Sequence, residues 1–145
     1  MAHKYNRIVV AVDGSKTAEK AFRKAVDVAK LNGATLFIVH VIDTSSAKMF
    51  DMLYQNMYDL VHEHAKVLLE GYELFAQEAG LQSIEKIVVK GSPKAFLTKQ
   101  LGEITNADLI VCGKTGVGEI EQLLIGSTTE AIVRHAKCDV LIVGE

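Results

Sequence analysis

Hydrophobic positions follow two different patterns along the chain. Short segments rich in apolar and β-branched residues, typical of strands, occupy residues 8–12, 35–42, 84–89, 109–112 and 140–143. The first of them is continuously apolar, which suits a strand buried on both faces of a parallel sheet. Between these segments, apolar residues recur three and four positions apart, which indicates amphipathic helices over residues 18–29, 53–80, 93–104 and 127–135. Strands that alternate with helices from end to end predict one α/β domain over residues 1–145, with an open, mainly parallel five-stranded sheet and helices on both faces.

Several helix boundaries are predicted from the residues found there. Asn32-Gly33 is a stop signal, and Ser92-Pro93 combines a capping serine with a proline at the first helical position. Ser127, with Glu130 three residues later, matches a capping box. The methionine-rich segment 48–57 is predicted to form either the first turns of the second helix or a mobile flap or partner surface.

Ligands of such sheets bind outside the carboxyl ends of the strands, where the strand order reverses. The loops that follow strands are therefore the places to search, namely residues 13–15, 41–43, 90–91 and 113–126. The last of these holds four of the eleven glycines. It fails as a P-loop because Asp108 stands where the first glycine is needed, and it fails as a dinucleotide fingerprint because Glu121 replaces the third glycine.

The glycine spacing that remains is G-x2-G-x9-G-[ST], formed by Gly113, Gly116, Gly126 and Ser127. It joins a strand end to a helix N-terminus, where bare backbone N–H groups and the helix dipole favour a phosphate. The Ser127 hydroxyl and the charge of Lys114 suit the same ligand. The alternative is that Gly113 only turns the chain and that Gly126 and Ser127 only start a helix.

Composition changes this picture little. The chain is 49% hydrophobic and 23% charged, which excludes disorder and coiled coil, and its net charge of −2 gives no basic footprint for nucleic acid. No apolar run approaches the roughly 18 residues of a membrane span, and no secretory signal core is present. Cys112 and Cys138 have neither zinc-site nor disulfide-framework spacing. A cytoplasmic protein is predicted.

Over its whole length the chain resembles the universal stress protein family, in its ATP-binding branch. The resemblance rests on Val10–Ser15, on His40–Asp43, on Gly91-Ser92-Pro93 and on the glycine pattern ending in Gly126-Ser127-Thr128. It implies a Rossmann-like fold of the adenine-nucleotide α-hydrolase type with strand order 3-2-1-4-5. It also implies bound ATP, with Mg²⁺ accompanying the phosphates.

The resemblance further assigns site residues. The adenosine end would be held by Val12, Asp13 and Val41, with Cys112 beside them. The ribose and phosphates would be held by Gly113, Thr115, Gly116, Gly126, Ser127 and Thr128. Many family members have serine directly after the first glycine, where this chain has Lys114, so the detail of the phosphate contact differs here.

Some of these residues have competing interpretations. Aspartate before Gly-Ser is also an ordinary turn and helix-cap residue, which applies to Asp13. Cys112 is either a small buried hydrophobe or a modifiable thiol beside the ligand. His40 is expected to be a hydrogen-bonded core residue of the second strand. No metal ligands and no catalytic residues are assigned.

The function expected from the resemblance is that of an ATP-binding regulatory homodimer in stress response. The dimer would form through the C-terminal edge strand, and it would be read by unidentified regulatory proteins. Two alternatives remain, a slow ATPase or autophosphorylating enzyme and a nucleotide-independent dimeric scaffold. No obvious general base or arginine finger lies in the loops, which disfavours efficient catalysis.

Overall fold

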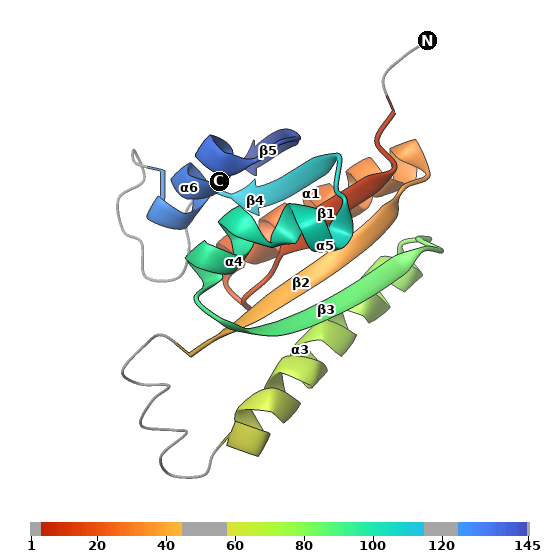
Figure 1. Ribbon diagram of the computed structural model, residues 1–145. Helices are drawn as coiled ribbons and strands as arrows, with labels where there is room; N and C mark the ends of the chain where they lie inside the picture. The colour runs from red at the N-terminus through yellow and green to blue at the C-terminus, as the bar shows by residue number, and fades with distance from the viewer. Residues whose placement is uncertain (1–3, 45–57, 115–124, 145) are drawn as a thin grey trace.

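The computed structural model describes residues 4–44, 58–114 and 125–144. Its centre is a five-stranded parallel sheet in the order β3-β2-β1-β4-β5 (Figure 1). The predicted α/β architecture and the strand order 3-2-1-4-5 are thereby confirmed. The strands are β1 (Arg7–Ala11), β2 (Thr35–Asp43), β3 (Ile84–Gly91), β4 (Leu109–Gly113) and β5 (Asp139–Val143).

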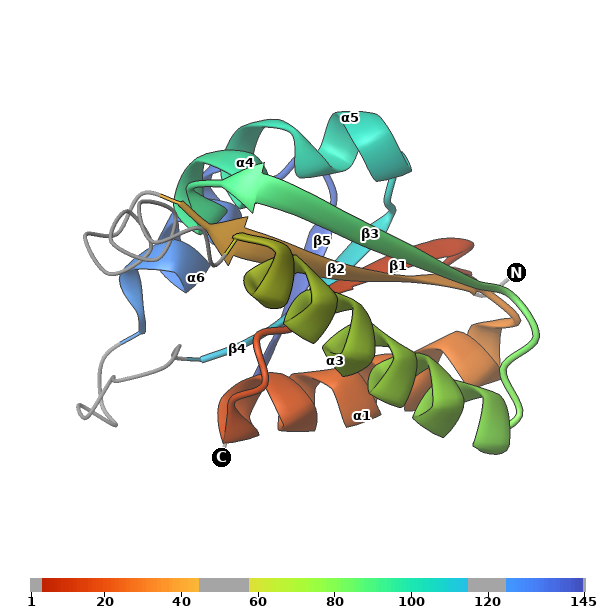
Figure 2. The same cartoon turned by 90° about the horizontal axis from the view of Figure 1, so that it is seen from below.

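Helices cover both faces of the sheet, as expected. One face carries α1 (Lys16–Asn32) and α3 (Tyr58–Glu78), which lie side by side, and the other carries α4 (Pro93–Lys99), α5 (Leu101–Thr105) and α6 (Ser127–His135) (Figure 2). The segment 48–57, with its two alternative interpretations, lies outside the described residues. None of the helices among the described residues is long and apolar enough to cross a membrane.

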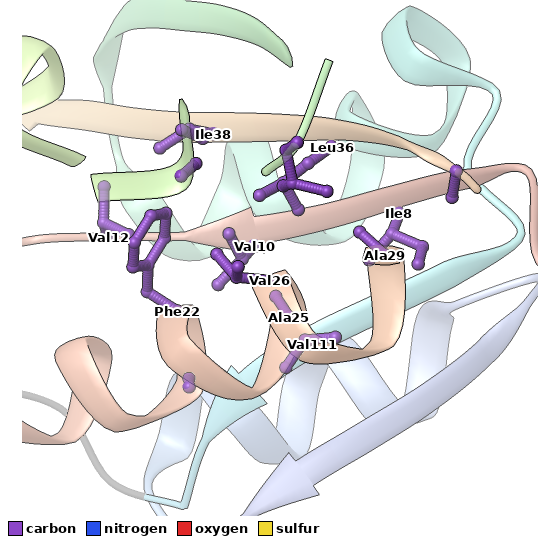
Figure 3. Close-up of a cluster of buried hydrophobic side chains, with 14 of the residues drawn as sticks. Ile8, Val10, Val12, Phe22, Ala25, Val26, Ala29, Leu36, Ile38 and Val111 are labelled. Atoms are coloured by element: carbon purple, nitrogen blue, oxygen red, sulfur yellow. The ribbon is translucent and has the colours of Figure 1, made fainter. Parts of the chain in front are cut away.

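The core consists of two apolar layers, one on each side of the sheet. Side chains alternate along a strand, so Ile8 and Val10 of β1 pack toward α1, while Val9 between them packs toward α4 and α5. Figure 3 shows the first layer, in which Phe22 and Val26 of α1 lie beneath the central strands. Because both faces of β1 are buried, the first apolar run of the sequence needed no alternation of polar residues.

Two predicted helix boundaries are confirmed. Gly33 ends α1 in the left-handed conformation, with φ of 63°. Its N–H donates to the carbonyls of Ala29 and Lys30 in the last turn of the helix. Ser92 caps α4, because its side chain accepts a hydrogen bond from the Ala95 N–H, and Pro93 follows at the first helical position.

Two details of the predicted helices are wrong. The helix expected over residues 93–104 is divided at Gln100 into α4 and α5, which leaves Ile104 53% exposed instead of on a buried face. The capping box at Ser127 does not form, since the residue before it, Gly126, occupies the N-cap position without a side-chain hydrogen bond. Ser127 is instead the first residue of α6, which leaves its hydroxyl out of any cap.

Candidate functional site

A pocket of about 330 Å³ opens at the carboxyl ends of β1, β2 and β4, where the strand order reverses. Eight of the ten residues predicted from the sequence line it together. They are Val12, Asp13, Val41, Cys112, Gly113, Gly126, Ser127 and Thr128. The other two, Thr115 and Gly116, lie outside the described residues.

The backbone just after β1 is fixed from two sides. The Val12 N–H donates to the Val39 carbonyl at 2.8 Å, which extends the ladder with β2 by one residue. The Val12 carbonyl in turn lies 2.8 Å from Nδ1 of His40, and a carbonyl only accepts, so Nδ1 carries the proton. His40 is therefore hydrogen-bonded and half-buried, as expected, and it holds the pocket wall in place.

The turn that follows uses Asp13 and Ser15 as local hydrogen-bonding residues. Oδ1 of Asp13 accepts from the Ser15 N–H at 2.9 Å, and Oγ of Ser15 accepts from the Ala18 N–H at 3.1 Å, which caps α1. Gly14 between them has φ of 84°, a conformation that favours glycine. The turn interpretation of Asp13 is thus confirmed, although the cap is Ser15, and its exposed carboxylate still borders the pocket.

Gly113 at the end of β4 has its Cα directly against the first turn of α1. A Cβ atom at this position would stand 3.1 Å from the Thr17 carbonyl oxygen and 3.3 Å from the Thr17 Cβ. The Gly113 carbonyl accepts a 2.8 Å hydrogen bond from the hydroxyl of Thr129 in α6. This glycine therefore joins the N-terminal turns of two helices, one from each face of the sheet.

The N-terminus of α6 presents a group of polar hydrogens to the pocket. The Gly126 N–H is already used, since it donates to the Lys114 carbonyl at 2.9 Å, and the Gly126 carbonyl accepts from the Glu130 N–H. The N–H groups of Ser127, Thr128 and Thr129 precede the first intrahelical bond and find no acceptor among the described residues. With the hydroxyls of Ser127 and Thr128, they form a site suited to an anion.

Part of the pocket is apolar. It is lined by Val12, Val41, Leu97 and Ile132, with Cys112 among them. Cys112 is only 6% exposed, and burial raises the pKa of its thiol to about 11. At neutral pH this thiol is protonated and behaves as a small apolar side chain, which favours the first of its two sequence-based interpretations.

The sequence-based set omits nine of the residues that line the pocket, among them Thr17, Asp43 and Thr129. Thr17 and Thr129 hold Gly113, and Asp43 ends β2 beside Val41. Asp43 belongs to a motif already singled out at a strand end, so its place in the chain was a sufficient signal. Thr17 and Thr129 follow Asp-Gly-Ser and Gly-Ser-Thr by one or two residues, and both start a helix that opens onto the pocket.

Comparisons with known proteins agree with this architecture. The sequence model of the universal stress protein family matches residues 4–144. A putative universal stress protein of Staphylococcus haemolyticus is 44% identical over 139 residues, which is 96% of this chain and 84% of that protein. Among solved structures, the universal stress protein UspA of Lactobacillus plantarum superposes with a TM-score of 0.86 at 29% identity, covering 98% of this chain and 99% of its own. A universal stress protein in complex with cAMP superposes with a TM-score of 0.71 at 29% identity, covering 97% and 98%.

Proposed function

The chain belongs to the universal stress protein family, and on this premise we propose that its pocket binds ATP and that it acts as a cytoplasmic nucleotide-sensing regulator of stress response. Adenine would occupy the apolar part of the pocket beside Val12 and Val41. The phosphates would lie against the N-terminus of α6. Ordering of the chain around the nucleotide would change a surface that partner proteins read.

One observation carries this proposal, the arrangement of the two parts of the pocket. Three backbone N–H groups and two hydroxyls at the start of α6 share one cavity with an apolar wall at the ends of β1 and β2. An adenine nucleotide has matching parts, a flat apolar base at one end and anionic phosphates at the other. The donors of Ser127 and Thr128 need no rearrangement to meet an anion, because the helix itself leaves them without acceptors.

A related protein supports the choice of an adenine nucleotide, since a universal stress protein at 29% identity was solved in complex with cAMP. Mg²⁺ would be bound mostly through the phosphate oxygens and water. Asp13 and Asp43 are the carboxylates among the described residues that line the pocket.

The test is to denature the purified protein, identify any released nucleotide, and measure the shift of the melting temperature on adding ATP. We expect ATP to stabilise the protein by about 2.7 kcal/mol at 100 times its dissociation constant. The paired variants Ser127→Ala and Thr128→Val should weaken ATP binding roughly ten-fold while the fold remains intact. The matched control is Thr98→Val. Thr98 lies outside the pocket, and its hydroxyl donates to the Lys94 carbonyl of its own helix.

Gly113 is a poor position for this test, because a side chain there meets Thr17 whether or not a phosphate binds. If ATP neither co-purifies nor shifts the melting temperature, and the Ser127 and Thr128 variants resemble the wild type, the ATP proposal is wrong. The nucleotide-independent scaffold then replaces it.

We also propose that the homodimer forms through β5. The two sheet edges differ in charge: β3 carries Glu85, Lys86 and Lys90, whereas β5 is Asp139 followed by four apolar residues. Charged side chains on an edge strand discourage pairing with another strand. The edge with fewer charged residues, β5, is therefore the one that a second copy would cover.

The mass of the wild-type protein in solution tests the dimer directly. Ile142→Lys should halve the mass of the wild-type assembly, while Glu85→Lys on the other edge should leave it unchanged. Circular dichroism of both variants shows whether the fold persists, which matters because Ile142 also packs on the α6 side of the core. A monomeric wild type, or a folded Ile142→Lys variant that keeps the full mass of the wild-type assembly, contradicts the β5 interface.

A further inference from the structure

The face of the molecule formed by α1 and α3 carries an apolar ridge and an apolar groove side by side. The ridge, here called the α3 stripe, consists of Leu60, Val67 and Leu74, which are 66%, 59% and 56% exposed. Their spacing of seven residues places them in one line along the helix, about 21 Å long. Apolar side chains aligned on an exposed helix face are typical of a packing surface.

The groove, here called the α1/α3 groove, has a volume of about 310 Å³. Its apolar walls are Phe22 of α1 with Leu68, Tyr72 and Phe75 of α3, and the ring centroids of Phe22 and Tyr72 are 4.7 Å apart. Gly71 borders it from α3, and a Cβ there would meet nothing within 4 Å. Among the described residues, no apolar side chain fills the groove and none covers the adjacent α3 stripe.

The charges on this face are divided between the two helices. The exposed charged side chains of α1 are five cationic and two acidic, a net charge of +3, and those of α3 are four acidic and one cationic, a net charge of −3. The cationic set is Lys16, Lys20, Arg23, Lys24 and Lys30 on α1, and the acidic set is Asp59, Glu63, Glu70 and Glu78 on α3. One face therefore holds both members of a complementary pair.

We propose that this face binds a second copy of the same chain, with the α3 stripe of each copy seated in the α1/α3 groove of the other. Both helices run against the direction of the parallel strands, so they are parallel to each other (Figure 2). A two-fold axis along the helices places α3 of each copy beside α1 of its partner and brings opposite charges together. A two-fold axis that lies in the interface plane but runs perpendicular to the helices would place α1 of one copy on α1 of its partner. The like charges of these two helices would then repel.

This interface is separate from the β5 edge, and the proposal does not rest on the proposed nucleotide binding. The test is sedimentation of the wild type and of the exposed-site variants Val67→Glu and Leu74→Glu over a concentration series. We expect each variant to halve the mass of the wild-type assembly. Ile104→Glu on the opposite face of the sheet is the matched control, since Ile104 is 53% exposed, and it should change nothing.

Charge reversal tests whether the occupant is a second copy. Glu70→Lys on α3 and Lys24→Glu on α1 should each weaken association, and the double variant should restore it. Ile142→Lys separates the two interfaces: a pair that survives this substitution and is lost with Val67→Glu supports the proposal. It is overturned if Val67→Glu leaves the mass unchanged at every concentration, if Ile142→Lys alone yields monomers, or if the double charge reversal does not restore association.

Discussion

The carbonyl oxygen of Thr17 lies 3.1 Å from the point that a Cβ atom would occupy at Gly113. The Thr17 carbonyl is part of the backbone and a Cβ is fixed to it, so neither atom can move aside by rotation of a side chain. We expect Gly113→Ala to lower the free energy of unfolding by about 1–3 kcal/mol, the usual range for overpacking. Chemical denaturation measures this change.

Gly71→Ala is the control for that experiment, since a Cβ at Gly71 meets nothing within 4 Å and the position lies inside α3. This variant should be more stable than the wild type by about 0.5–1 kcal/mol, because alanine loses less backbone entropy in a helix. Equal effects at the two positions would show that the Thr17 contact does not limit position 113.

Thr129→Val is expected to destabilise the protein by about 1–3 kcal/mol. The substitution keeps the shape of the side chain but removes the 2.8 Å hydrogen bond to the Gly113 carbonyl, and Thr129 is buried. Thr128→Val, one residue earlier, removes a hydroxyl that has no partner among the described residues, and it should leave stability within about 0.5 kcal/mol of the wild type. Thermal unfolding of both variants compares them, and a loss of equal size would contradict the role given to Thr129.

Ser15→Ala is expected to cost about 1 kcal/mol, because α1 loses the side-chain acceptor for its Ala18 N–H. Ser15→Asn should recover most of that loss, since asparagine is an equally good capping residue. Urea denaturation of the three proteins provides the measurement. Failure of asparagine to recover stability would mean that the serine acts through another contact, such as its 3.2 Å approach to the Thr17 hydroxyl.

The buried thiol of Cys112 predicts a dependence of stability on pH. Burial raises its pKa from 9.0 to about 11, so the folded protein holds this proton more tightly than the unfolded chain does. The thiol's contribution is fully present below pH 9 and is lost as pH rises through about 11. Between pH 8 and pH 10 the wild type should lose roughly 1 kcal/mol more than Cys112→Ala, measured by denaturation at both values. An equal loss of stability in the wild type and in Cys112→Ala would contradict this prediction.

The sequence was most informative where one physical pattern dominates. The apolar runs of β1 and β4 became central strands because a strand buried on both faces requires such a run. The loops at strand ends that line the pocket, such as residues 13–15 and 41–43, followed from the rule that parallel strands bring their carboxyl ends to one edge. The assignment of Val12 and Val41 to the site came from family resemblance. The order of the strands came from family resemblance.

The sequence was less informative where distant residues decide local structure. The start of α6 was misplaced by one residue because Gly126 is held by the Lys114 carbonyl, a contact that no local spacing reveals. Thr17 was missed for the same reason, since its partner Gly113 is 96 positions away and meets it only when α1 packs on β4. The break at Gln100 interrupts a stretch whose apolar spacing continues to Ile104.

The turn after β1 lies between the two proposed binding sites, the nucleotide pocket and the α1/α3 groove. Asp13 and Ser15 border the pocket, while Gly14 between them borders the α1/α3 groove. Any free energy by which one occupant shifts this turn must act on the other with equal size and the same sign, because linkage between two binding equilibria is reciprocal. A ten-fold effect of nucleotide on self-association would therefore require a ten-fold effect of self-association on nucleotide affinity, and protein concentration would set the sensitivity of the sensor.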